Sequence, residues 1–247
     1  MTEMNAGKGP DRDPEKACVI YRDTAPGSFV RRINRFTAVV LTEGQEQTVH
    51  VKNTGRLAEL LVPGAKVTLQ KADTSPGSAG APARKTAYDL ISVYKDGSGW
   101  VNIDSLVPNK LVKQHLLGLD YDLVRPEFTY GDSRFDFYME RGEERCLMEV
   151  KGCTLAADPA LFGQGTGLFP DAPTERGVKH LKELAAAAGK GYHCFAAFVI
   201  QMNGVHRVLP NDMTQPAFGQ ALSMAEKAGV EIVFYPCRVE ADRICFI

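Results

Sequence analysis

The pattern of the sequence changes once, near Asp96-Gly97-Ser98-Gly99, and this change limits the possible folds more than any other feature. Before it, short runs of β-branched and aromatic residues alternate with turn signals such as Glu43-Gly44 and Pro63-Gly64. After it, strand-like runs alternate with amphipathic helical patterns. The 247 residues are enough for two cores. We therefore expect an all-β domain at 17–97 and an α/β domain at 98–247.

The first domain is predicted to be a small β-barrel. Four runs read as strands, at 28–41, 48–52, 66–71 and 87–94, and a short helical segment is expected at 56–61. Several short strands with one small helix fit an OB-like barrel, and an SH3-like barrel is the alternative. Residues 1–16 are polar and without periodicity, which predicts a disordered leader, and the loop at 73–83 is rich in Ser, Gly, Pro and Ala.

The second domain is predicted to contain a mixed sheet with helices on both faces. A helix begins at Pro108, and two strand runs at 129–139 and 145–151 are joined by a turn around Arg141-Gly142. Thr174 is a candidate N-cap for a helix that ends at Gly189. Further runs read as a strand at 194–201, a helix around 218–229 and a strand at 230–235. An antiparallel pair followed by alternating helices and strands predicts such a sheet.

Composition excludes several classes of protein. No run approaches the roughly 18 apolar residues of a membrane span, and residues 1–16 lack the apolar core of a signal peptide. The six cysteines form no C-x-x-C pair, so neither a zinc cluster nor a disulfide framework is expected. We interpret them as reduced thiols in a cytoplasmic protein that does not enter membranes.

A basic stretch in the first domain suggests nucleic-acid binding. The net charge is −1, but 17–97 holds 11 Lys and Arg side chains against 7 Asp and Glu. The excess includes Arg31, Arg32 and Arg35, which lie beside Phe36. Cations around an aromatic ring suit a phosphate backbone and a stacked base. A solvated surface is the alternative, and counting alone favours it.

Two carboxylates and an amine are the candidate catalytic residues. Strand alternation places Glu149 and Lys151 on one face, and the preceding strand can bring Asp136 beside Glu149. Two carboxylates held together suit Mg²⁺ or Mn²⁺, which would polarise a phosphate and activate water, with Lys151 as a nearby charge. An ordinary solvated sheet face is the alternative.

Farther along, Arg176 and Lys179 lie in the first turns of a predicted helix and could contact a phosphate. The alternative is that Lys179 pairs with Glu183 on the helix surface.

Several unusual motifs occur in order along the chain: Arg32-x-x-Arg35-Phe36, Asn53-Thr54-Gly55-Arg56, Pro63-Gly64, Gly131-Asp132-Ser133-Arg134-x-Asp136-Phe137, Glu149-Val150-Lys151 and Leu168-Phe169-Pro170-Asp171-Ala172-Pro173-Thr174-Glu175-Arg176-Gly177-x-Lys179-His180. Together they resemble the sugar fermentation stimulation protein A family over nearly the whole chain. The resemblance implies an OB-like domain, a PD-(D/E)XK nuclease-like domain, DNA binding and a regulatory role in sugar metabolism, particularly that of maltose.

The resemblance carries the nuclease pattern onto Asp136, Glu149 and Lys151. The candidate nucleic-acid contacts are Arg31, Arg32, Arg35, Phe36, Asn53, Arg56, Arg134, Arg176 and Lys179. Many nucleases of this superfamily also have a Glu on the first helix, where this chain offers Gln114 and His115.

Three functions remain open at this point. The first is a Mg²⁺- or Mn²⁺-dependent nuclease acting on DNA or RNA. The second is a non-catalytic, non-specific DNA-binding regulator that retains the nuclease fold. The third is a carbohydrate-binding module, because OB loops also bind oligosaccharides. No cluster of Trp residues supports the third, since Trp100 is the only one.

Overall fold

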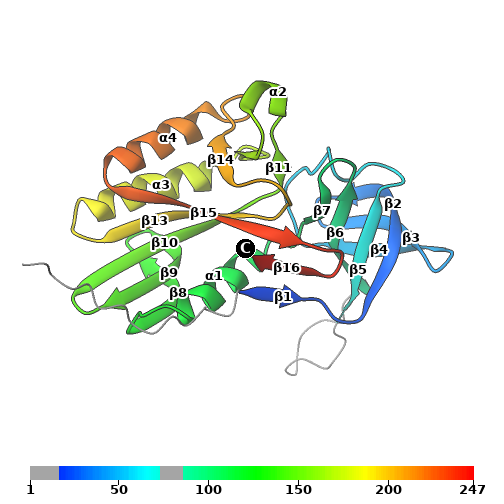
Figure 1. The fold of residues 1–247 in the computed structure, drawn as a ribbon, viewed down its shortest axis with the longest axis horizontal. Helices are drawn as coiled ribbons and strands as arrows, with labels where there is room; N and C mark the ends of the chain where they lie inside the picture. The colour runs from blue at the N-terminus through cyan, green and yellow to red at the C-terminus, as the bar shows by residue number, and fades with distance from the viewer. Residues whose placement is uncertain (1–16, 73–85) are drawn as a thin grey trace, which may run out of the picture.

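Three β-sheets and four helices make up the part of the chain that the computed structural model describes, residues 17–72 and 86–247 (Figure 1). The predicted leader at 1–16 and loop at 73–83 lie outside these residues. The smaller of the two main sheets forms a barrel, and the larger is covered by helices (Figure 1).

The barrel has six strands in the order β4-β3-β2-β5-β6-β7, and a parallel β4–β6 pairing closes it. The strands are β2 (Thr24–Asn34), β3 (Thr37–Thr42), β4 (Gln45–Val51), β5 (Lys66–Lys71), β6 (Tyr88–Lys95) and β7 (Gly99–Asn102). Val49, Val51, Val67 and Leu69 fill it at the period-two spacing of strands. The tight β3–β4 turn is possible because Glu43 and Gly44 both adopt positive φ, 51° and 76°. The OB-like barrel is therefore confirmed.

Two local predictions in the barrel are wrong. The run at 28–41 is two strands that turn at Arg35 and Phe36. The expected helix at 56–61 is a loop of turns, because Leu57 adopts a φ of 51° that interrupts a right-handed helix. The Leu57 side chain is fully buried in the core. Burial of this one side chain outweighs the helical pattern of its neighbours.

The larger sheet has the order β1-β16-β15-β13-β10-β9-β8. Its strands are β1 (Cys18–Ile20), β8 (Leu123–Tyr130), β9 (Ser133–Arg141), β10 (Glu144–Cys153), β13 (His193–Ile200), β15 (Val230–Val239) and β16 (Arg243–Phe246). β10, β13 and β15 are parallel, and the remaining pairs are antiparallel. The prediction of a mixed sheet is confirmed.

Helices cover both faces of this sheet, as predicted. α3 (Glu175–Ala188) and α4 (Pro216–Lys227) lie on one face, and α1 (Val107–Leu117) packs on the other (Figure 1). Thr174 caps α3 through its hydroxyl, and the helix ends at Gly189. A small third sheet, which the sequence did not predict, is formed by β11 (Leu155–Ala156), β12 (Thr166–Phe169) and β14 (Arg207–Pro210), beside the single turn of α2 (Pro159–Phe162).

The structure moves the boundary between the predicted domains. β1 was expected in the barrel but pairs with β16 in the larger sheet, while β7 was expected in the second domain but pairs with β6. The backbone N–H of Asn102 donates to Gln201 O (2.9 Å), and the buried Gln201 amide donates to Asn102 and Asp104. The two domains are thus joined by a hydrogen-bonded, buried interface.

The prediction that every cysteine is a free thiol is also wrong. Cys18 and Cys245 are directly opposite each other in the β1–β16 pair and form a disulfide. The other four cysteines are free and buried. Separation along the sequence concealed the pair, because the two residues are 227 positions apart. Within the described residues, no helix is long and apolar enough to cross a membrane.

Candidate active site

The candidate site lies where β9 and β10 separate. Their regular pairing ends at Phe137 opposite Met148. Beyond that point a side chain replaces the backbone carbonyl as the partner of β10: Asp136 Oδ2 accepts a hydrogen bond from Val150 N at 2.7 Å. Its Oδ1 accepts one from Nδ2 of Asn109, on the first turn of α1, at 2.7 Å. Asp136 is therefore held from both the sheet and α1.

Glu149, on the adjacent strand β10, is almost fully buried. Its Oε1 lies 2.5 Å from Lys151 Nζ and 2.5 Å from His180 Nδ1. Its Oε2 is buried without a hydrogen-bond partner among the described residues. A buried carboxylate oxygen without a partner is costly, so this atom is the clearest candidate ligand for an ion.

The two carboxyls have pKa values shifted in opposite directions. Burial raises the pKa of Asp136, the nearby Glu149 charge raises it further, and the hydrogen bonds from Val150 and Asn109 offset only part of this. Burial also acts to raise the pKa of Glu149, but the contacts with His180 and Lys151 outweigh it and leave the pKa lowered. The two carboxyls of the site are therefore tuned in opposite directions by their different partners.

α3 supplies the side chains that hold Glu149 in place. Arg176 Nε donates to His180 Nε2 at 3.4 Å, which assigns the ring proton to Nδ1, facing Glu149. Capping of the helix by Thr174, whose Oγ1 accepts from Gly177 N at 3.0 Å, sets the position of this first turn. The Glu149 carboxylate is thus oriented by a helix as well as by its own strand.

Three of the predicted nucleic-acid contacts gather beside His180. Arg134, Arg176 and Lys179 line a cavity of about 530 Å³, together with Ser133, whose buried Oγ has no hydrogen-bond partner among the described residues. Lys179 Nζ donates to Asp132 O at 3.0 Å and also lies 3.7 Å from Glu183 Oε1, the surface pair considered as the alternative. Arg134 pairs only loosely with an exposed Glu127. Three cationic side chains thus line one cavity beside His180, the partner of Glu149.

In the barrel the predicted contacts fall into two groups. Arg32 is turned inward, and its guanidinium donates to the five carbonyl oxygens of Asn34, Arg35, Asn53, Gly55 and Arg56. The Asn53 side chain is also engaged, with Ile103 O and Gly55 N. The Arg32 guanidinium and the Asn53 amide are both fully engaged within the barrel. We therefore assign Arg32 and Asn53 to the support of the turn at Asn34 and Arg35 and of residues 53–56.

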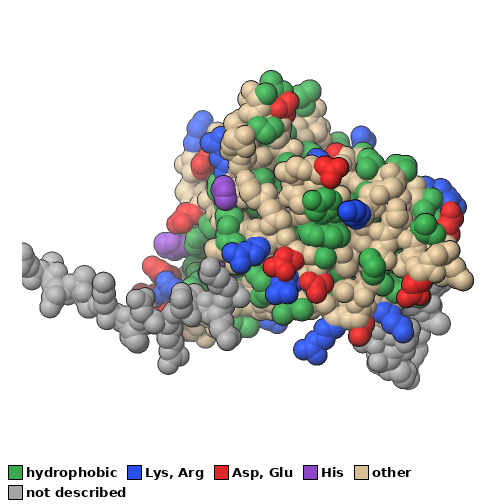
Figure 2. Space-filling model, turned by 45° about the vertical axis from the view of Figure 1, so that its right-hand side comes forward, with side chains coloured by type: hydrophobic (Ala, Val, Ile, Leu, Met, Phe, Trp, Pro, Cys, Tyr) green, Lys and Arg blue, Asp and Glu red, His purple; other side chains and the backbone are tan. Residues whose placement is uncertain are grey.

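The remaining barrel candidates are exposed. Arg31 pairs with Glu46 at 3.4 Å, Arg35 lies over the Phe36 ring at 5.4 Å from its centre, and Arg56 faces solvent. Phe36 is 49% exposed. On the face drawn in Figure 2, Lys and Arg side chains are interspersed with Asp and Glu. The placement of individual residues therefore matters more here than bulk charge.

Sequence reasoning missed two residues of the site, Asn109 and His180. Gln114 and His115 are the residues that the first helix offered from the sequence, but Gln114 accepts from Cys18 N, and His115 packs on Tyr235 and Phe246. Asn109 instead reaches Asp136, because it lies on the first turn of α1. A signal for His180 was available, since it follows Arg176 by four residues and so lies on the same helix face.

The donors fit a hard divalent ion in part. Within the described ranges, no group of three or more His, Cys, Asp and Glu side chains is placed to hold a metal. Asp136 and Glu149 nevertheless supply carboxylate oxygens from adjacent strands, and Glu149 Oε2 has no other partner. Mg²⁺ and similar ions are often held by one or two carboxylates and complete their shell with water and phosphate oxygens.

Comparison with known proteins identifies the family. Residues 30–103 match the model of the SfsA N-terminal OB domain, and residues 105–243 match that of the sugar fermentation stimulation protein RE domain. The chain belongs to the sugar fermentation stimulation protein family. The junction between the two family models lies next to the end of β7, in agreement with the boundary seen in the structure.

Relatives in the family match along almost their whole length. The chain is 47% identical to a sugar fermentation stimulation protein homolog of Desulfitobacterium hafniense, covering 91% of this chain and 93% of that protein. The homolog of Clostridium beijerinckii is 44% identical, with 91% and 95% covered. Among solved structures, SfsA of Pyrococcus furiosus in complex with Ca²⁺ superposes with a TM-score of 0.77 at 26% identity, covering 94% of this chain and 96% of that one.

Proposed function

We propose that this protein is a Mg²⁺- or Mn²⁺-dependent nuclease that cleaves DNA or RNA, with Asp136, Glu149 and Lys151 as a PD-(D/E)XK catalytic set. The observation that carries the proposal is the buried Glu149 Oε2, which has no partner among the described residues and lies on the strand next to Asp136. The relative from Pyrococcus furiosus was solved in complex with Ca²⁺, a hard cation of the same charge. An OB barrel is a frequent carrier of single-stranded nucleic acid, which supports the choice of substrate.

The residues of the chain would share the work of the reaction. Asp136 and Glu149 would hold the ion, which when bound polarises the phosphate and lowers the pKa of water. Lys151 places an ammonium charge beside the phosphate, and its pairing with Glu149 keeps that charge close to the strand. His180 fixes the orientation of Glu149 and Asn109 that of Asp136, as partners of metal ligands commonly do. Arg134, Arg176 and Lys179 would bind neighbouring phosphates, and Arg31, Arg35, Phe36 and Arg56 of the barrel the rest of the strand.

A cleavage assay tests the proposal. The purified protein is incubated with labelled DNA and RNA and with Mg²⁺, Mn²⁺ or EDTA, beside Asp136→Ala, Lys151→Ala and the control Asp120→Ala, which removes an exposed acid of the same domain. We expect metal-dependent products from the wild type and the control, and a loss of on the order of 100-fold or more in the two site variants. Equal products from all four proteins would identify a contaminant and end the nuclease proposal.

A binding assay separates the nuclease from a non-catalytic protein. Affinity for labelled DNA, measured in EDTA over a salt series, should fall with a log–log slope of roughly one for each phosphate contacted. Salt-dependent binding without cleavage would support the non-catalytic DNA-binding protein instead. A slope near zero would contradict both.

A further inference from the structure

A second cavity, of about 390 Å³, lies between the barrel and the larger domain. Its walls include Arg35 and Thr54 from the barrel, Gly152 and Thr154 from the end of β10 and beyond, and Ala172 and Thr174 from the segment that enters α3. We call this cavity the interdomain pocket. It differs from the cavity of about 530 Å³ lined by Arg134, Arg176 and Lys179, with which it shares no lining residue.

The interdomain pocket is adjacent to the candidate active site along two elements. Gly152 directly follows Lys151 in β10, and Thr174 caps the helix that carries Arg176 and His180. Both cavities therefore border the start of α3, one at Thr174 and the other at Arg176. A nucleic-acid strand bound at Lys151 and Arg176 would thus pass next to the interdomain pocket.

The walls of the interdomain pocket are tightly built. A Cβ atom at Gly55 would collide with Asp171 Oδ2, and one at Gly152 would collide with Gln201 Oε1. Arg32 holds the barrel loop by its hydrogen bonds to Asn53, Gly55 and Arg56. Both the Asn53–Arg56 motif and the motif around Asp171 thus contribute to one rigid, preformed cavity, which lowers the cost of binding a ligand.

The lining has the chemistry that recognises a nucleotide. Thr54, Thr154 and Thr174 bring hydroxyl groups that can pair with a base edge or a sugar hydroxyl, while backbone N–H groups of Arg56 and Ala172 hold the Asp171 carboxylate in the wall. Arg35 is exposed, makes no ion pair within the described residues and stacks on Phe36. A cation beside an aromatic ring binds the phosphate and the face of a base. A volume of about 390 Å³, near the lower end of the ~300–1,000 Å³ range of ligand pockets, suits a ligand of about one nucleotide.

We propose that the interdomain pocket holds one unpaired nucleotide of the strand contacted by the candidate active site, so that the substrate is single-stranded or locally unpaired nucleic acid. The inference rests on the proposed function for the identity of the strand. Duplex nucleic acid would then be bound productively only after a nucleotide leaves the helix, which costs a few kcal/mol.

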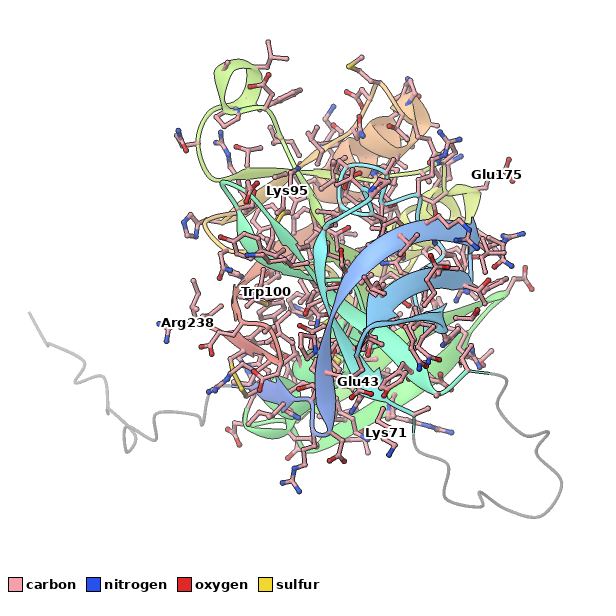
Figure 3. All side chains as sticks on the ribbon, turned by 90° about the vertical axis from the view of Figure 1, so that its right-hand side faces the viewer. Glu43, Lys71, Lys95, Trp100, Glu175 and Arg238 are labelled. Atoms are coloured by element: carbon pink, nitrogen blue, oxygen red, sulfur yellow. A yellow bond between two sulfur atoms is a disulfide. The ribbon has the colours of Figure 1, made fainter. Side chains whose placement is uncertain are left out.

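Binding, measured without cleavage, tests the pocket. Affinities of the full chain in EDTA are compared for a single-stranded DNA oligonucleotide that carries one 2-aminopurine and for the same strand in a duplex. Thr54→Glu places a negative charge at the pocket wall, and Ala172→Leu fills the pocket without adding charge. Thr24→Glu is the matched control, since Thr24 is exposed and pairs with Gln70. Figure 3 shows Lys71, the neighbour of Gln70, far from Glu175 on the first turn of α3.

We expect tighter binding of the single strand by the wild type, with a change in 2-aminopurine fluorescence. Thr54→Glu and Ala172→Leu should each weaken single-strand binding by about tenfold and remove the fluorescence change, while Thr24→Glu alters affinity by less than about twofold. Circular dichroism verifies that each variant is folded. Equal affinities for single strand and duplex, or equal effects of Thr54→Glu and Thr24→Glu, would overturn the inference.

The outcome is distinguishable from failure of the proposed function. If the Thr54 and Ala172 variants weaken single-strand binding but no Asp136-dependent cleavage is found, the pocket proposal stands and the nuclease proposal is excluded. If cleavage requires Asp136 and Lys151 but neither pocket variant changes single-strand binding, the nuclease remains and the pocket proposal fails.

Discussion

Arg31 and Arg32 are adjacent in the sequence but have opposite environments. The Arg31 side chain is 61% exposed and makes one surface pair, whereas Arg32 donates to five carbonyl oxygens, two at the turn between β2 and β3 and three in residues 53–56. Hydrogen bonds from a charged donor stabilise a fold more than neutral ones do. Arg32 therefore supports the fold, whereas Arg31 stays a proposed contact for nucleic acid.

Arg32→Ala should lower the free energy of unfolding by about 3 kcal/mol, because several backbone carbonyls lose a charged donor. Arg31→Ala should change it by less than about 0.5 kcal/mol, but should reduce the salt slope of nucleic-acid binding by about one. Urea unfolding measures the first quantity and a salt series of binding the second. Equal stabilities of the two variants would contradict the inward role of Arg32.

Asn109, on the first turn of α1, is the residue of that helix that reaches the candidate carboxylates. Its amide donates to Asp136, so it orients one carboxylate without adding a third. The site consequently has fewer anionic ligands than a fully acidic one. We expect such a site to depend on phosphate oxygens and water for the rest of the ion's shell.

At the scale of elements, the separation of β9 from β10 creates the site. Asp136 fills the gap by accepting from Val150 N, and Glu149 turns to the α3 side, where His180 and Lys151 contact it. α3 is placed by its Thr174 cap and by close packing on α4, since a Cβ at Gly177 would crowd Phe218. The strands β9 and β10 and the helices α1 and α3 thus set the partners and the pKa shifts of Asp136 and Glu149.

The opposite pKa shifts of that pair predict opposite effects on stability in EDTA. The raised pKa of Asp136 means that its ionised form destabilises the fold, so the native state loses this penalty as the pH falls through the raised pKa towards 3.8. Asp136→Asn should therefore be more stable than the wild type at pH 8, with an advantage that shrinks on acidification. Urea unfolding between pH 8 and pH 4 measures this difference.

Glu149→Gln serves as the control of opposite sign. The lowered pKa of Glu149 means that its charge stabilises the fold above pH 4.5, and that this contribution is lost as the pH falls through the lowered pKa. Glu149→Gln should thus be less stable than the wild type at pH 8. Added Mn²⁺ should stabilise the wild type and neither variant. Stability changes of the same sign in both variants would contradict the proposed electrostatics.

At the scale of the whole molecule, the two ends of the described chain meet in one sheet. β1 pairs with β16 next to β15, and the Cys18–Cys245 disulfide joins them across 227 positions. A cross-link that closes a long loop removes much of the entropy of the unfolded chain. The disulfide therefore ties the segment before the barrel to the end of the larger domain.

Reduction should lower the stability of the wild type by about 2–5 kcal/mol and leave that of Cys18→Ser unchanged. Urea unfolding with and without dithiothreitol measures the difference, and peptide mapping without reductant should find Cys18 and Cys245 in one linked fragment. Thiol titration of the unfolded wild type without reductant should count the four free cysteines. Six reactive thiols would exclude the disulfide.

The features that could be predicted from the sequence are those with local causes. Thr174 and Gly189 bound α3 as expected, α1 begins around Pro108, and the β9–β10 hairpin turns beyond Arg141, because capping, periodicity and turns depend on residues within a few positions. The short strands β1 and β16 were missed, since their stability comes from pairing with each other. Leu57 shows the same limit, because burial of its side chain overrides a local helical pattern.

The sequence by itself determined that an all-β domain precedes an α/β domain, and it determined the family. It also singled out Asp136, Glu149 and Lys151, which share the β9–β10 hairpin. Only the tertiary structure decided that Arg32 faces inward, that Asn109 and His180 reach the carboxylates, and that Glu149 Oε2 is left without a partner among the described residues. The physical reason is the range of the interactions. Strand and helix patterns arise from neighbours along the chain, whereas burial, hydrogen bonding and pKa depend on segments that meet only after the chain has folded.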